Sequence, residues 1–140
     1  MILVDTSAWV EYDRATGSPA DVRVSELISA STDIAVTEPV VMEVLAGARD
    51  EERASDLRRL MLRFRLLRFD SVIDFEGAAR VYRRCRRSGI TPRGMVDCMI
   101  ATVALRTGAA LLAYDLDMSH IADVIGIDLD HASIRIGSPP

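Results

Sequence analysis

Two short apolar stretches decide the fold of this chain: MILVD at residues 1–5 and AALLAYD at residues 109–115. Each is typical of a buried β-strand, and each ends in an aspartate. Residues 33–36 and residues 66–69 are predicted as two further strands. Because helical segments separate the strands along the chain, we expect them to form a parallel sheet.

The segments between the strands carry the signals of helices. Thr37 is predicted to cap one helix, Asp70 or Ser71 another, and Pro92 to occupy the first position of a third. We expect helices over residues 6–14, 20–30, 38–47, 50–64, 72–88, 92–106 and 118–125, and a short strand near 127–129. The predicted fold is a three-layer α/β/α arrangement around a short parallel sheet of about four to five strands.

Length and composition indicate one globular domain. With 140 residues, 49% of them hydrophobic and 27% charged, the chain is expected to fold as a single domain over residues 1–140. No apolar run approaches the ~18 residues of a membrane span. The early Asp5 argues against a signal peptide, and the two cysteines favour a reducing cytoplasm.

The basic residues exclude several classes of enzyme. All 17 are arginine, and without lysine the chain has neither a P-loop nor a Schiff-base nucleophile. Only two histidines are present, which argues against a histidine-rich metal site or a Ser-His-Asp hydrolase. The net charge of −4 argues against non-specific nucleic-acid binding, but it is compatible with a local acidic site beside basic patches.

Two carboxylates stand alone in apolar helical segments. Asp97 is the only charged residue in residues 95–105, and Glu43 is the only one in residues 40–46. Burying an unpaired carboxylate costs several kcal/mol. Each acid therefore lies on a solvated face, pairs with an arginine, or belongs to a functional site, and the pattern alone leaves these readings open.

Further carboxylates follow predicted strands. Asp5 ends the first strand, and Asp115 ends the strand at residues 109–114, with Asp117 two residues later. The carboxyl ends of parallel strands lie at one edge of a sheet, so these side chains are expected to converge there. Capping or turn formation explains each of them equally well. For Asp70, which also follows a strand, we expect capping alone.

The acids at these helix and strand positions together require a cation. Two carboxylates about 4 Å apart repel by about 4 kcal/mol at an effective dielectric constant near 20. Oxygen ligands without histidine or cysteine favour Mg²⁺ or Mn²⁺, which support phosphodiester hydrolysis. The candidate ligands are Asp5, Glu43, Asp97 and Asp115.

Four ordered segments carry a family resemblance: residues 1–9 (MILVDTSAW), 38–47 (EPVVMEVLAG), 93–101 (RGMVDCMIA) and 111–121 (LLAYDLDMSHI). In their order and spacing they resemble a PIN domain, and more narrowly a VapC-type toxin of a bacterial toxin–antitoxin pair. The resemblance implies a PIN-like fold and a ribonuclease that depends on Mg²⁺ or Mn²⁺. It places the family's acids on Asp5, Glu43, Asp97 and Asp115, with Asp117 as the second acid of the D-x-D segment.

The resemblance also implies partners. Toxins of this family typically cut structured RNAs such as tRNA or rRNA, form dimers, and are silenced by a VapB-type antitoxin that lies across the active-site groove. The chain departs from the family at Ala113, where threonine is frequent, and at Met118, where an aromatic residue is usual. These departures leave open whether Asp115 or Asp117 is the fourth ligand.

Arginines gather in two clusters, and a single arginine precedes Asp97. Each cluster is read either as a solvated helix face or as a contact for RNA phosphates, and acidic groups of an antitoxin would fit the same side chains. Arg93, one helical turn before Asp97, is a candidate for an RNA phosphate contact beside the metal. The clusters are Arg58, Arg59, Arg63, Arg65 and Arg68, and Arg80, Arg83, Arg84, Arg86 and Arg87.

The resulting hypothesis is a metal-dependent endoribonuclease that acts as the toxin of a VapBC-type pair. A phosphoacceptor signalling domain also clusters aspartates at this sheet edge, but it usually requires a lysine, which the chain lacks. A non-catalytic PIN-like module that binds metal and RNA is the main alternative. A DNase or a general phosphatase is a further one.

Overall fold

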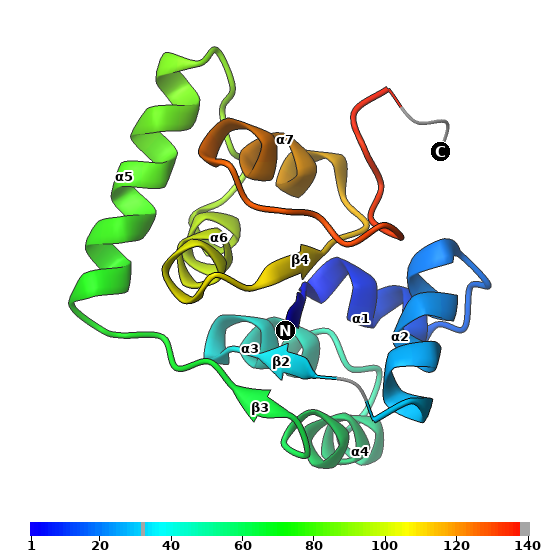
Figure 1. Ribbon diagram of the computed structural model, residues 1–140. Coiled ribbons are helices and arrows are strands. Elements are labelled where there is room, and N and C mark those ends of the chain that lie inside the picture. Colours follow the sequence, from blue (N-terminus) through cyan, green and yellow to red (C-terminus); the bar gives the residue numbers. More distant parts are fainter. Residues whose placement is uncertain (32, 138–140) are drawn as a thin grey trace.

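The computed structural model describes residues 1–31 and 33–137, and these contain a four-stranded parallel sheet (Figure 1). The strand order is β3-β2-β1-β4, and every neighbouring pair is parallel. The strands are β1 (Ile2–Val4), β2 (Ile34–Val36), β3 (Arg65–Leu66) and β4 (Ala110–Leu112). The predicted α/β class is confirmed.

Helices connect the strands, as neighbouring parallel strands require. They are α1 (Thr6–Asp13), α2 (Pro19–Ser29), α3 (Glu38–Ala46), α4 (Glu51–Met61), α5 (Ile73–Arg87), α6 (Met95–Thr107) and α7 (Leu116–Ile125). In Figure 1, α5 and α6 lie on one side of the row of strands, and α1 and α2 lie on the other. Among the described residues, none of the helices has both the length and the apolarity that crossing a membrane demands.

All of the predicted strands are shorter in the structure than expected, β3 and the one near residues 127–129 among them. β3 ends at Leu66, whereas the prediction ran to Phe69. The Phe69 amide donates a 2.8 Å hydrogen bond to the Glu38 side chain, which removes it from the strand ladder. The strand expected near residues 127–129 is reduced to one parallel bridge between Leu111 and Leu129.

The helix that carries Asp97 begins later than predicted. α6 starts at Met95 rather than at Pro92, because Gly94 is extended with φ −155° and ψ 158°. The Arg93 amide donates to the Asp117 carboxylate at 3.1 Å instead of joining the helix. Six of the 13 residues of α6 are buried in the core, so the first turn of a firmly packed helix holds Asp97.

The helix starts show which capping predictions hold. Asp70 accepts hydrogen bonds from the amides of Val72 and Ile73 at 2.9 and 2.8 Å, so its predicted capping role at α5 is confirmed. Thr37 occupies the predicted N-cap position of α3, but among the described residues its side chain makes no capping hydrogen bond. Its hydroxyl is buried and makes no hydrogen bond within the described structure.

α5 and α6 pack against each other in opposite directions. Asp74, near the start of α5, accepts hydrogen bonds of 2.8 and 2.7 Å from Arg106, near the end of α6. One turn further along α5, Gly77 approaches Thr102 so closely that a Cβ atom at Gly77 would overlap the threonine hydroxyl. This contact sets how far α6 is shifted along α5, and it thereby sets the position of Asp97 along the helix pair.

Candidate metal centre

The two strand-end aspartates lie at the same edge of the sheet. β1 and β4 are adjacent and parallel, with Val4 opposite Leu112. Asp5 follows β1 directly, and Asp115 follows β4 by three residues. Each also caps a helix, because Asp5 accepts from the Ser7 amide and Asp115 from the Met118 amide. Asp5 and Asp115 therefore each cap a helix and also belong to the acidic site.

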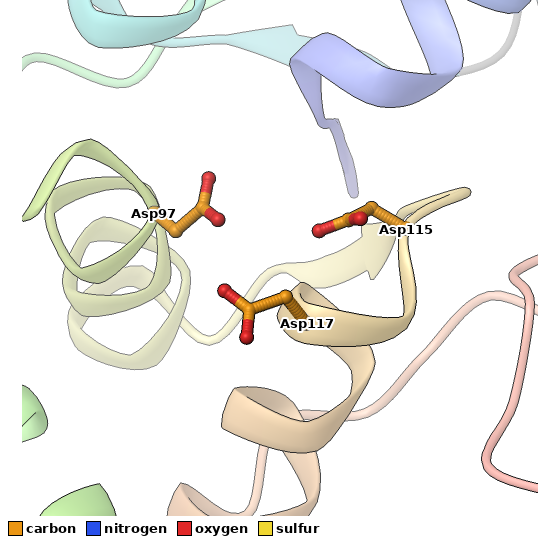
Figure 2. Close-up of side chains that lie close together, drawn as sticks. All are labelled: Asp97, Asp115 and Asp117. Carbon is orange, nitrogen blue, oxygen red and sulfur yellow. The ribbon is translucent and has the colours of Figure 1, made fainter. Parts of the chain in front are cut away.

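Three aspartates form an acidic cluster at this edge (Figure 2). Asp97, Asp115 and Asp117 each offer a carboxylate oxygen, and these oxygens lie within 4.8 Å of one another. The side chains come from α6, from the residue that caps α7, and from the first turn of α7. Segments separated in sequence thus bring three oxygen donors to one place.

An open pocket of about 360 Å³ joins the cluster to the other predicted ligands. Four of the five predicted acids line it, and Asp117 lies beside it within the cluster described above. The predicted acids in the lining are Asp5, Glu43, Asp97 and Asp115, and Glu11, which sequence analysis did not single out, lines it as well. The structure therefore gathers all five predicted acids in one region, while their role as ligands stays a prediction.

Two hydroxyl groups hold these carboxylates in place. The Thr6 hydroxyl donates a 2.7 Å hydrogen bond to Glu43. The Ser7 hydroxyl donates to Asp5 at 2.6 Å and accepts from the Tyr114 amide at 2.8 Å. Sequence analysis missed both roles, although the two hydroxyls directly follow Asp5 and thus emerge at the same sheet edge.

Asp5 has an oxygen that the protein leaves without a partner. The Asp5 side chain is buried, and its Oδ1 accepts no hydrogen bond within the described structure. Burial raises the pKa of Asp5 to about 6, against the lowering effect of the Ser7 hydrogen bonds, and the nearby carboxylates of Glu43 and Asp115 raise it further. A buried acceptor without a donor indicates a cation partner.

Asp97 is the most strongly perturbed acid on the pocket wall. Burial raises its pKa to about 7, and the carboxylates of Asp5, Asp115, Glu43 and Asp117 add to the effect in that order. Repulsion of this kind is removed by a bound cation. A hard divalent cation fits the site on two grounds, because every donor is oxygen and one buried oxygen lacks a partner.

Arg93 is the cationic side chain on the wall of this pocket. Its guanidinium donates a 2.6 Å hydrogen bond to Asp115 and lies 3.8 Å from Asp117, while 72% of the side chain is exposed. The Asp115 hydrogen bond raises the pKa of Arg93, so this side chain stays charged. The structure thus places Arg93 beside the acidic cluster, with most of its surface open to solvent.

Comparison with known proteins identifies the family. The sequence profile of the PIN domain family matches residues 2–124 of this chain. The chain is 47% identical to Ribonuclease VapC11 of Mycobacterium tuberculosis over 136 residues, which cover 96% of this chain and 100% of the relative. The chain belongs to the PIN domain family, and within it to the VapC ribonucleases.

Solved structures share the fold at low sequence identity. VapBC2 from Rickettsia felis, bound to a DNA fragment from its promoter, has a TM-score of 0.71 at 18% identity, with 93% of this chain and 98% of that chain covered. VapC20 of Mycobacterium tuberculosis, a toxin that cleaves the sarcin-ricin loop, has a TM-score of 0.61 at 20% identity, with 85% and 93% covered. These likenesses show the PIN-like fold.

Proposed function

We propose that this protein is a metal-dependent endoribonuclease and the toxin of a VapBC-type toxin–antitoxin pair. The observation that carries the proposal is the convergence of the predicted acids, four in the wall of one open pocket and Asp117 beside it, in a chain 47% identical to a VapC ribonuclease. Proteins with this fold include toxins solved with their antitoxins, such as the Rickettsia felis VapBC2 pair.

The proposed ion is Mg²⁺, with Mn²⁺ as an alternative. Its ligands would come from Asp5, Glu43, Asp97, Asp115 and Asp117. When bound, such an ion offsets the carboxylate repulsion, polarises a phosphate oxygen and lowers the pKa of a water molecule. This chemistry is phosphodiester hydrolysis.

The side chains around the acids have separate tasks in this proposal. Ser7 orients Asp5 and ties it to the backbone after β4, and Thr6 orients Glu43. Arg93 neutralises Asp115 in the metal-free protein. Once a cation takes over that role, the exposed guanidinium of Arg93 would be available for a phosphate of the RNA.

The proposed partners follow from the same assignment. The substrate is a structured RNA, tRNA or rRNA; among the structural neighbours, VapC20 cleaves the sarcin-ricin loop. A VapB-type antitoxin would silence the protein, and the protein is proposed to act as a homodimer in the cytoplasm. Residues 1–140 are proposed to be a single domain.

RNA cleavage by the antitoxin-free protein tests the function. Total tRNA and rRNA are incubated with the protein in Mg²⁺ or Mn²⁺, with EDTA as the metal-free control. Asp97→Asn should abolish the fragments and keep the fold. The matched control is Asp123→Asn, because Asp123 is an exposed acid of α7 outside the pocket.

Discrete fragments that require both the metal and Asp97 would support the ribonuclease. Cleavage by Asp97→Asn within tenfold of the wild type would contradict the proposed role of Asp97. Absence of any RNA cleavage while the metal still binds would favour a non-catalytic PIN-like module or a ribonuclease with a very narrow substrate.

A further inference from the structure

The second half of α5 carries a dense positive charge. Five of the eight residues from 80 to 87 are arginine, and all five are exposed. Within the described part of the chain, none of them takes part in an ion pair. The helix dipole favours cations at this end, but like charges three and four residues apart repel each other. Such a face is stabilised by an anionic partner.

Most of these arginines line one groove. The groove has a volume of about 340 Å³ between α5, α6 and α7, and its wall includes Arg80, Arg83, Arg84 and Arg87. At its floor, Val81 and Ile125 are only 5% and 6% exposed, and Leu105 is the one large apolar side chain that is open, at 49%. An amphipathic peptide helix needs several apolar anchors. The groove therefore suits a polyanion better than an acidic helix.

The groove lies against the second halves of α6 and α7, at Thr102, Leu105 and Ile125, and the last arginines of α5 extend from it toward the end of the helix pair that carries the acidic pocket. The Asp74–Arg106 and Gly77–Thr102 contacts together show that α5 and α6 run antiparallel, so residues 83–87 lie about level with residues 93–97. Burial, and after it the carboxylate of Asp117, raises the pKa of Cys85, which is consistent with this half of α5 lying near the acidic cluster. The short segment between α5 and α6 joins the two charged regions.

We propose that the exposed arginine face of α5, residues 80–87, binds the sugar–phosphate backbone of RNA and holds the strand beside the acidic pocket. The inference rests on the proposed ribonuclease function. The pocket by itself repels a polyanion, because its wall holds five acids and one arginine, and Asp117 lies beside it. One guanidinium group can donate two hydrogen bonds to the oxygens of one phosphate. Arginines at positions i, i+3, i+4 and i+7 lie on one face of a helix and can contact successive phosphates over about 10 Å.

The test compares two pairs of exposed arginines. Arg83→Gln/Arg87→Gln removes two charges from α5, and Arg63→Gln/Arg65→Gln removes two beside the opposite, amino end of β2 and β3. Both pairs are placed in an Asp97→Asn background, so that RNA stays intact. Fluorescence anisotropy with fluorescein-labelled total tRNA measures affinity between 50 and 200 mM NaCl.

The α5 variant should show a shallower dependence of affinity on salt. Losing two phosphate contacts reduces the slope of log K against log salt by about 1.5, and affinity near 100 mM NaCl should fall about tenfold or more. The control variant, Arg63→Gln/Arg65→Gln, should have the same tRNA affinity and salt slope as the Asp97→Asn parent. Circular dichroism and the single variants Arg83→Gln and Arg87→Gln separate this effect from misfolding.

Equal slopes and affinities for the α5 pair and the parent would overturn the inference. Unchanged tRNA binding with weaker binding of poly-L-glutamate would also overturn it, and would assign the face to an acidic protein segment. In the cleaving protein, Arg83→Gln/Arg87→Gln should raise KM and leave kcat unchanged. If the wild type cuts no RNA but the salt slope changes as expected, the proposed function fails and the binding surface stands.

Discussion

The hydroxyl of Thr6 donates a 2.7 Å hydrogen bond to Oε1 of Glu43, and this bond joins the first residue of α1 to the middle of α3. Glu43 has a long, flexible side chain, and it is one of two pocket acids that a neighbouring hydroxyl holds. Loss of a residue that hydrogen-bonds a metal ligand typically lowers metal affinity or activity by about 10- to 100-fold.

Thr6→Val tests that relationship. Valine keeps the shape of the side chain but cannot donate to Glu43, so we expect Mn²⁺ affinity to fall by about tenfold, by calorimetric titration. The control is Thr107→Val, because the Thr107 hydroxyl bonds only backbone carbonyls at the far end of α6. Equal Mn²⁺ affinity in Thr6→Val and the wild type would show that Glu43 needs no orienting partner.

Arg93→Gln should separate metal binding from RNA cleavage. The variant removes the cation that pairs with Asp115, so Mn²⁺ should bind at least as tightly as in the wild type. Cleavage should fall about 10- to 100-fold, because a charge-assisted hydrogen bond to phosphate contributes about 1.5–3 kcal/mol. Calorimetry and a cleavage assay measure the two effects. Weaker Mn²⁺ binding would mean that Arg93 orders the acids rather than competing for them.

The raised pKa of Asp97 predicts how the metal-free protein responds to pH. Its pKa of about 7 exceeds the ordinary value of 3.8, so the folded state keeps a proton that the unfolded chain releases above about pH 4. The free energy of unfolding should therefore fall as pH rises from about 4 to about 7, by up to about 1.4 kcal/mol per pH unit.

Urea unfolding in EDTA at pH values from 4.5 to 7.5 checks this prediction against Asp97→Asn. The wild type should lose stability relative to the variant as pH rises, and Mg²⁺ should restore it most at the upper end. Parallel curves for the two proteins would argue that Asp97 titrates normally in the folded state.

Gly77→Ala should destabilise the protein although alanine favours helices. The added methyl group would overlap the Thr102 hydroxyl, and overpacking of this kind costs about 1–3 kcal/mol against a helix-propensity gain of about 1 kcal/mol. Urea unfolding of Gly77→Ala, Thr102→Ala and the double variant measures the coupling. The methyl group should cost less when Thr102 is alanine, whereas additive effects would contradict the close contact.

Local strands and caps could be predicted from the sequence, whereas contacts between distant segments could not. Local patterns predict strands at residues 1–5 and 109–114 and capping by Asp70, and the structure contains β1 and β4 within these ranges and the Asp70 cap. The start of α6 was predicted three residues too early, because the bond from the Arg93 amide to Asp117 joins segments 24 residues apart in sequence. A local helix signal contains no information about such a bond.

For the site, the sequence by itself determined which acids stand out: those that end apolar strands and those that are isolated in apolar helices. Burial of a charge is costly, so its position in an apolar segment is informative without coordinates. Only the tertiary structure decided how closely Asp117 approaches Asp97 and Asp115, that Ser7 and Thr6 hold two carboxylates, and that Arg93 neutralises Asp115. The physical reason is that hydrophobic periodicity specifies the elements, whereas strand order and helix packing set the few ångströms between side chains on which coordination depends.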